Sequence, residues 1–290
     1  MNKTENSRHP RLSPSPRLRR TGRGDDDSLC AFQLPRVIAS MTSFPAAIKY
    51  AADAVRSILR GRKLPDKIVV YLTESQWTNG IPKELSDIKS ELLEVRFWKE
   101  NIRSYTKLVP ALHDFPNDII ITFDDDIEYS RSMIARLLRA HKRYPNAIIA
   151  NVTRPVGITE SGDVLPYKEW KRNRGLYAFT HSSRPSFRNL VLGYSGMLYP
   201  PRVFDKTVLD SKIFMELAPS TDDIWFWAMA VKNGTRIKPV WLGAFTYKNR
   251  YLGKPDAIGL LSENIIKMDK NKIATENILR RFPEILEKLN

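Results

Sequence analysis

Apolar segments of two different periodicities alternate along residues 36–152, and this alternation limits the folds that the chain can adopt. Short, continuous apolar runs such as 118–123 are typical of strands that are buried on both faces of a sheet. The segments between these runs repeat apolar residues every three or four positions, as amphipathic helices do. We predict strands at 37–42, 67–72, 93–98, 118–123 and 147–152, and helices at 48–58, 84–93, 105–113 and 133–138.

Strands that alternate with helices predict an α/β fold, built on a mixed and mainly parallel sheet flanked by helices. Beyond residue 154 the pattern is less regular. There we predict an extended segment at 190–199, a helix at 221–232 that ends before Gly234, a strand at 236–241, and a helical C-terminal segment from 258 onward with a break at Pro283.

The N-terminal segment differs in composition from the rest of the chain. Residues 1–34 are rich in Ser, Pro and Arg and almost without large apolar side chains, so they cannot bury enough surface to offset the entropy of ordering. We therefore expect residues 1–34 to be a disordered basic tail. The regular pattern assigns 35–250 to one domain and 251–290 to a helical C-terminal extension.

The net charge is +15, and residues 1–36 contribute only eight Lys or Arg against four Asp or Glu. The body therefore stays strongly basic, which favours anionic partners such as nucleotides, nucleic acid or an anionic membrane surface. The single cysteine, Cys30, excludes an intrachain disulfide and suits a reducing compartment. No apolar run approaches the roughly 18 residues of a membrane span. We expect a cytoplasmic protein, with peripheral contact to the inner face of the membrane as a further option.

The acidic triplet Asp124-Asp125-Asp126 carries most of the chemical information, because it directly follows a strand that is expected to be buried. Ligands of open α/β sheets bind beyond the carboxyl ends of the strands. Carboxylates crowded there repel one another unless a cation neutralises them, and Mg²⁺ or Mn²⁺ prefers such oxygen ligands. The same triplet at 25–27 lies in the tail, where three acids are simply solvated. An acidic loop tip is the alternative interpretation of the second copy as well.

A second acidic site, Asp222-Asp223, opens the predicted helix at 221–232. These acids either favour the helix N-terminus, with Ser220 or Thr221 as N-cap, or one of them takes a proton from an attacking hydroxyl as a general base. Lys107 precedes the strand that leads to the triplet, and it is either a solvated lysine or a contact for a phosphate group.

The order of these features resembles glycosyltransferases of the GT-A fold. The residues that carry the resemblance are the first strand, the Asp-X-Asp of 124–126, the Gly-rich segment 193–196 and the acidic pair 222–223. The match covers roughly residues 36–245 and looks closest to bacterial family 2-like enzymes of capsule, lipopolysaccharide or other surface glycans. It implies an inverting transfer of a sugar from a nucleotide diphosphate donor to a hydroxyl of a glycan or glycolipid acceptor.

The resemblance also implies roles for single residues. Asp124 would contact the donor's nucleoside and, with Asp126, the metal, which is Mn²⁺ or Mg²⁺. Asp223 matches the base of inverting enzymes, with Asp222 beside it. Donor binding further falls to Thr42, Ser43, Lys107 and Asp125. The chain departs from many such enzymes in lacking a late histidine for the metal, since its four histidines all precede residue 182.

Three other classes of protein share some of these features. A sugar-nucleotide pyrophosphorylase needs a basic Gly-rich loop after the first strand, and residues 42–45 do not form one. A haloacid-dehalogenase-like phosphatase would use Asp124 as nucleophile, but that motif normally opens its domain, whereas three strands precede it here. A non-catalytic nucleic-acid-binding protein would explain the charge, although it gives no reason for acids at a strand end, and we predict no nucleic-acid partner.

Overall fold

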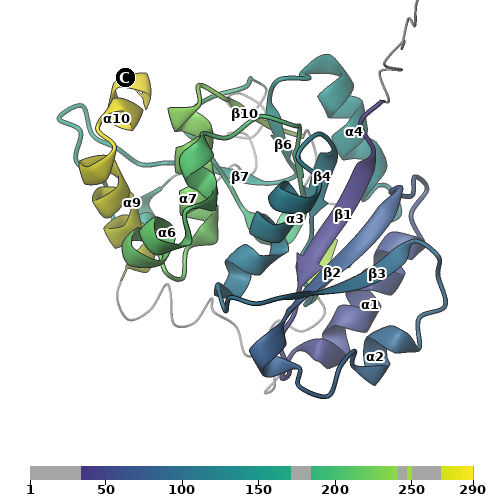
Figure 1. Ribbon diagram of the computed structural model, residues 1–290. Coiled ribbons are helices and arrows are strands. Elements are labelled where there is room, and N and C mark those ends of the chain that lie inside the picture. Colours follow the sequence, from purple (N-terminus) through teal and green to yellow (C-terminus); the bar gives the residue numbers. More distant parts are fainter. Residues whose placement is uncertain (1–33, 171–183, 241–246, 250–268, 290) are drawn as a thin grey trace, which may run out of the picture. The chain divides into compact units, whose positions relative to one another are not determined.

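The computed structural model describes residues 34–170, 184–240, 247–249 and 269–289. At its centre lies a seven-stranded sheet with the order β10-β6-β9-β4-β1-β2-β3 (Figure 1). Only β9 runs antiparallel to its neighbours, β4 and β6. The predicted mixed and mainly parallel sheet is therefore confirmed. Its strands are β1 (Val37–Thr42), β2 (Lys67–Thr73), β3 (Leu93–Trp98), β4 (Ile119–Thr122), β6 (Ile148–Ala150), β9 (Met197–Tyr199) and β10 (Ile237–Pro239).

Helices cover both faces of this sheet, because successive strand residues point to opposite sides. In β1, Ala39 faces one apolar core with α1 (Ile48–Leu59), α2 (Lys83–Ser86) and α4 (Met133–Arg143). Ile38 faces the other core. That second core includes side chains of α3 (Val109–Asp114), α6 (Ser211–Leu217), α7 (Asp222–Lys232), α9 (Lys270–Arg281) and α10 (Glu284–Leu289). The expected flanking helices are thus present on both faces.

Two small antiparallel pairs lie outside the main sheet. One joins β5 (Ile127–Tyr129) to β11 (Tyr247–Asn249), and the other joins β7 (Thr153–Pro155) to β8 (Asn189–Val191). Short 3₁₀ helices complete the described structure at Glu74–Gln76, Arg103–Lys107, Tyr167–Glu169, Gly193–Ser195 and Lys206–Leu209. The first pair was not predicted, since three-residue strands leave no periodic pattern.

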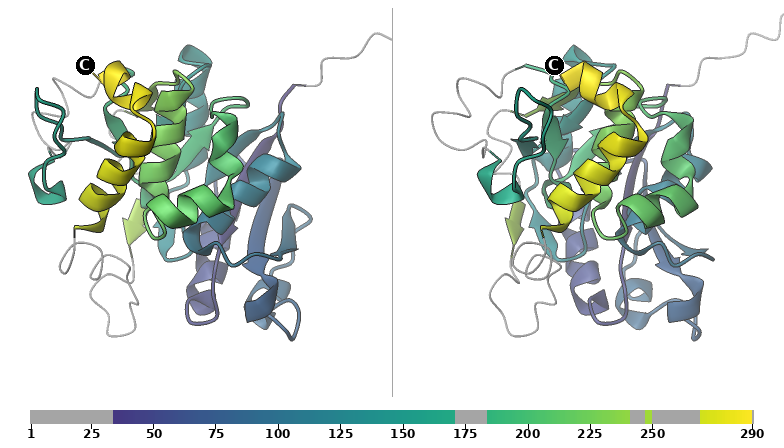
Figure 2. Two further views of the ribbon diagram at one scale, coloured as in Figure 1. Left: turned by 60° about the vertical axis from the view of Figure 1, so that its left-hand side comes forward. Right: turned by 90° about the vertical axis from the view of Figure 1, so that its left-hand side faces the viewer.

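The C-terminal helices belong to the same compact unit as the sheet, which extends from Pro35 to Asn290. α9 and α10 pack against α7 (Figure 2). The chain breaks between them at Pro283 as predicted, since proline cannot continue a helix. The predicted helix start at 258 lies outside the described residues, as does the predicted tail at 1–34 apart from Leu34. The assignment of 35–250 to one domain and of 251–290 to a helical C-terminal extension stays a prediction.

Three predicted elements differ from the structure. The helix expected at 84–93 is only the single turn α2, because Leu85 is its one fully buried apolar residue and packing stabilises short helices. The extended segment expected at 190–199 is interrupted by the 3₁₀ turn Gly193–Ser195, after which Gly196 adopts φ 86°. The region expected as one helix at 105–113 begins as a 3₁₀ turn and continues as α3.

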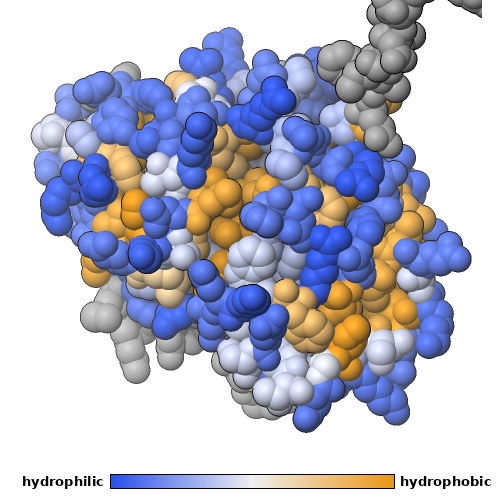
Figure 3. Space-filling model, viewed as in Figure 1, coloured by the Kyte–Doolittle hydropathy of each residue, from blue (hydrophilic) through white to orange (hydrophobic). Residues whose placement is uncertain are grey.

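The surface seen in Figure 3 is mostly hydrophilic, with apolar side chains exposed between charged ones, for example over the edge formed by β3 and α2. Phe97 of β3 and Ile81 before α2 are among the exposed large apolar residues. None of the helices in the described part of the chain combines the length and the apolar character that a membrane crossing requires.

Candidate active site

The acidic triplet lies at the carboxyl ends of the two neighbouring parallel strands β1 and β4. Asp124, Asp125 and Asp126 follow β4 and precede β5, while Ser43 follows β1 directly. The Ser43 hydroxyl donates to Oδ2 of Asp125 at 2.6 Å and so ties the two strand ends together. Thr42 uses its hydroxyl differently, because it donates to the backbone oxygen of Tyr71 on β2 at 2.8 Å.

Lys107 joins the triplet to the acidic pair. Its Nζ lies 2.9 Å from Oδ1 of Asp124 and 3.1 Å from Oδ2 of Asp222. Only 7% of its side chain is exposed. Burial alone would lower the pKa of Lys107, but the charges of Asp124, Asp222 and Asp223 outweigh burial and raise it well above its ordinary value. Lys107 is therefore a permanent buried cation between two acidic segments that are about a hundred residues apart.

The backbone around Lys107 is anchored to the sheet, because the Ser40 hydroxyl of β1 donates to the Lys107 carbonyl oxygen at 2.6 Å. Ser104, in the same 3₁₀ turn, donates to Oδ1 of Asp222 at 2.9 Å. Two side chains of this turn, Ser104 and Lys107, thus hold Asp222 at the start of α7. The solvated alternative for Lys107 is wrong.

The two acids of the pair diverge, as neighbouring residues on a helix must. Asp222 faces Lys107 and Ser104, whereas Asp223 accepts a hydrogen bond at Oδ2 from the backbone N–H of Gly193 at 2.9 Å. The other oxygen of Asp223, Oδ1, is buried without a hydrogen-bond partner among the described residues. Thr221 occupies the N-cap position, but its side chain makes no capping hydrogen bond.

Gly193 lies so close to this site that only glycine fits. A Cβ atom at this position would be 2.7 Å from Oδ1 of Asp223 and 2.9 Å from Nζ of Lys107. Side chains essentially never approach that closely, and both atoms belong to groups that are held in place. The Gly-rich segment 193–196 is therefore the element that brings the backbone next to the acidic pair.

Tyr129 of β5 connects the triplet to the Gly193 turn. Its buried hydroxyl accepts from the backbone N–H of Asp124 at 2.8 Å and donates to the backbone oxygen of Tyr194 at 3.0 Å. The sequence interpretation missed this residue, as well as Ser40 and Ser104. The only signal for Tyr129 was its place in the same short segment as the triplet.

Burial and mutual repulsion raise the pKa values of several acids here. Burial raises the pKa of Asp125 to about 7, with smaller contributions from the charges of Asp126 and Asp124. Burial and the Asp124 charge raise the pKa of Asp126 to about 6. The pKa of Asp223 is raised to about 7, first by burial and then by the charge of Asp222. The site holds more negative charge than its single lysine neutralises.

The donor set fits a divalent cation that arrives with phosphate ligands. Asp124 and Asp126 supply two carboxylates, and Asp126 forms no ion pair within the described residues. No group of three acidic, histidine or cysteine side chains in the described ranges is arranged to hold a metal by itself. Mg²⁺ commonly binds to one or two carboxylates and completes its shell with water and substrate phosphates. Two carboxylates are therefore sufficient for that kind of site.

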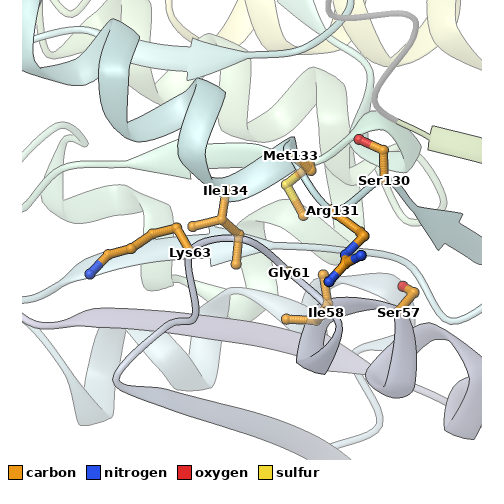
Figure 4. A pocket seen from close by; sticks show the side chains of 8 residues that line it. All are labelled: Ser57, Ile58, Gly61, Lys63, Ser130, Arg131, Met133 and Ile134. Atoms are coloured by element: carbon orange, nitrogen blue, oxygen red, sulfur yellow. The ribbon is translucent and has the colours of Figure 1, made fainter.

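A shallow hollow elsewhere on the molecule is unrelated to these residues. It has an empty volume of about 160 Å³ and lies between the end of α1 and the start of α4, lined by Ser57, Gly61, Arg131 and Met133 among others (Figure 4). The space inside the hollow is too narrow to hold a small molecule. The hollow contains none of the candidate residues.

Comparisons with known proteins add the following findings. No family model and no curated protein matches the sequence. Among solved structures, the chain is similar to the mannosyltransferase PcManGT from Pyrobaculum calidifontis, in complex with GDP-Man and Mn²⁺, at 15% identity and a TM-score of 0.46. The similarity covers 72% of this chain and 55% of the mannosyltransferase chain, so it spans little more than half of that protein.

A second similar structure is 4-diphosphocytidyl-2C-methyl-D-erythritol synthase from Anaerococcus prevotii DSM 20548, at 9% identity and a TM-score of 0.43. It covers 85% of this chain and 97% of the synthase. Likenesses this distant carry no conclusion about activity. The function must be argued from the residues of the site.

Proposed function

We propose that this chain is a glycosyltransferase that moves a sugar from a nucleotide diphosphate donor to an acceptor hydroxyl. The observation that supports this most is the position of Lys107, which contacts Asp124 of the triplet and Asp222 of the pair. A transfer between two substrates needs a donor site and an acceptor site side by side. The Lys107 contacts place the two acidic motifs next to each other in this way.

The donor half of the proposed site is the triplet with its neighbours. Asp124 and Asp126 would hold Mn²⁺ or Mg²⁺, and such an ion would neutralise the charge that develops on the departing diphosphate. Asp125 and Ser43 form the wall beside it, where we place the nucleoside. Thr42 contributes through its position rather than its hydroxyl, which is engaged with the backbone of β2.

The acceptor half is centred on Asp223. Its Oδ2 is fixed by the Gly193 N–H, which leaves Oδ1 to accept the proton of the attacking hydroxyl. Because burial and Asp222 raise its pKa to about 7, Asp223 binds and releases protons near neutral pH, as a general base should. The acceptor oxygen would attack the sugar carbon on the face opposite the diphosphate while its proton passes to Asp223. The bond from the sugar carbon to the diphosphate would break in the same step, which inverts that carbon. With the resemblance to family 2-like enzymes, we assign the product to bacterial surface glycans.

The experiment that tests this function titrates the purified protein with a panel of nucleotide sugars in the presence of Mn²⁺. Calorimetry measures the binding of each donor, and the release of product measures its hydrolysis. We expect one donor to bind and to be hydrolysed slowly without acceptor. Asp126→Ala should abolish transfer and leave the fold intact. The chain offers a matched control in Asp27→Ala, which alters the third position of the other triplet and should change nothing.

Two outcomes would contradict the proposal. Full activity of Asp126→Ala in the presence of a chelator would contradict the proposed metal-dependent donor site. Binding of no nucleotide sugar, together with hydrolysis of a phosphate monoester and phosphorylation of Asp124, would instead support the haloacid-dehalogenase-like alternative.

A further inference from the structure

Arg154 of β7 is a buried cation that the proposed mechanism does not use. Only 7% of the residue is exposed, and its guanidinium forms no ion pair with an acidic side chain in the described ranges. Its Nε is buried without a hydrogen-bond partner there, and its Nη1 makes a single 3.3 Å bond to the Tyr167 carbonyl oxygen. Arginine keeps its charge in proteins, and a buried charge is costly unless it is paired.

A second arginine, which is only partly buried, shows how this chain pairs such a group with carboxylates. Arg96 lies over the Phe115 ring at 4.9 Å, and its guanidinium donates to Glu94 and Asp114. Arg154 lies over the Tyr167 ring at 4.3 Å, but no carboxylate of the described residues pairs with it. The counter-charge that the chain supplies to one arginine is therefore left for a ligand at the other.

The topology brings Arg154 to the edge of the sheet where the candidate site lies. β6 and β4 both run antiparallel to β9, so they point the same way, and the chain that follows β6 emerges beside the triplet. Val152 accepts from the Leu192 N–H at 3.2 Å and donates to the Ser195 hydroxyl at 3.1 Å. Arg154 itself pairs with Leu190 of β8, the strand that leads into the Gly193 turn.

The Arg154 guanidinium is also held in a fixed plane. Tyr167 contacts the Trp170 ring edge-on at 5.0 Å, and the Trp170 indole donates to the Leu165 carbonyl oxygen at 2.8 Å. Gly157 leaves room for Trp170, because a Cβ there would lie 2.6 Å from its ring. The guanidinium carbon lies over the Tyr167 ring, and the Nε–H has no hydrogen-bond partner among the described residues. This N–H is therefore left for an oxygen acceptor.

We propose that Arg154 binds an anionic oxygen group, a carboxylate or a phosphate, that the acceptor of the sugar carries. The identification of this ligand as the sugar acceptor rests on the proposed glycosyl transfer. The anion site itself rests on the Arg154 contacts alone. Without such a cation, the acids Asp222 and Asp223 would repel an anionic acceptor. Arg154 offsets that repulsion and orients the acceptor toward the base.

The binding test measures the melting temperature of the full-length protein against inorganic phosphate and against glucuronate, with chelator present and ionic strength held constant by NaCl. We compare the wild type with Arg154→Gln. The matched control is Arg236→Gln, since exposed Arg236 also lies over an aromatic ring, Phe187, at 4.7 Å. The wild type and the control should respond to at least one anion. Arg154→Gln should bind it about tenfold more weakly, the effect of losing a charge-assisted hydrogen bond.

The activity test compares methyl glucoside, methyl glucuronoside and methyl glucoside 6-phosphate as acceptors, with the donor identified above. The preferred anionic acceptor tells carboxylate from phosphate, and Arg154→Gln should lose that preference while donor affinity stays unchanged. If Arg154→Gln does not fold, Arg154→Lys keeps the charge without the planar edge. A wild type that responds to neither anion overturns the proposal, as does an equal response of wild type and variant. Failure of donor binding instead overturns the proposed function and leaves the anion result intact.

Discussion

Two clusters in this molecule each combine basic and acidic side chains, but they differ in the balance between positive and negative charge. At the sheet edge, Arg96 and Lys67 face Glu94 and Asp114, so two cations meet two carboxylates. These side chains are between a fifth and about a third exposed. Arg96 and Lys67 lower the pKa of Glu94, and hydrogen bonds from His113 and Arg96 outweigh burial to lower that of Asp114. The cluster is neutral and complete by itself.

At the candidate site, a single cation, Lys107, contacts Asp124 and Asp222. The pKa values of Asp223 and Asp126 are raised, and Oδ1 of Asp223 has no partner in the described ranges. Structural ion pairs in a folded protein lower the pKa of their acids, whereas an excess of buried acid costs stability unless a ligand compensates it. This difference supports our proposal that the second cluster is a functional site.

The largest expected effect is on turnover. Asp223→Asn keeps the size of the side chain and removes the proton acceptor, so turnover should fall by roughly 10²–10⁴-fold, the usual share of a general base. Donor affinity, measured by calorimetry, should hardly change. The matched change at the sheet edge, Asp114→Asn, should leave turnover unchanged. A loss of turnover in Asp114→Asn of similar size would show that the two clusters do not differ in function.

The second effect is on stability. Lys107→Met leaves the largely buried Asp222 and the partly buried Asp124 without their cation, which should cost about 3–5 kcal/mol of unfolding free energy. Arg96→Met removes a partly exposed cation, and solvent screening should limit the loss to about 1 kcal/mol. Urea unfolding at pH 8 measures both. Equal losses in the two variants would mean that the difference in burial between the two clusters does not affect what each cation contributes to stability.

The pH dependence should have opposite signs in the two clusters. Asp223 has a pKa of about 7 in the folded protein, raised by burial and by Asp222 against the lowering effects of Lys107 and the Gly193 N–H. Between about pH 4 and 7 the folded state then holds more protons than the unfolded state, so this group lowers stability as pH rises. Turnover should rise over the same range, as the base loses its proton.

At the sheet edge, stability should change with pH in the opposite direction, because the pKa values of Glu94 and Asp114 are lowered. Their contribution to stability is complete above the ordinary carboxyl pKa and is lost as the pH falls through the lowered values. Melting temperatures from pH 3 to 8 separate the two groups. Asp223→Asn should make the decline above pH 4 shallower and leave the acid limb unchanged, while Asp125 and Asp126 still contribute to the decline. A decline as steep as that of the wild type would argue against the raised pKa of Asp223.

Local patterns in the sequence predicted the sheet and its flanking helices well. The apolar residues that become buried recur with a period that differs between strands and helices. The acidic triplet and the acidic pair were also recognisable from their positions after a strand and before a helix. Their joint contact with Lys107 was not, since it depends on how β1 and α7 pack across the fold. The close approach of Gly193 likewise has no signal beyond the glycine itself.

The smallest effect compares two buried tyrosines, one in each cluster. Tyr129→Phe removes a hydroxyl that accepts from the Asp124 N–H and donates to the Tyr194 carbonyl oxygen, and Tyr71→Phe removes one that donates to Asp114. Each loss should cost about 1–2 kcal/mol of stability. Only Tyr129→Phe should also weaken donor binding, by about threefold to tenfold, because it releases the backbone that carries the triplet. Calorimetric titration of both variants tests this. Equal donor affinity in the two variants would show that Tyr129 only stabilises the fold, and that the triplet keeps its position without it.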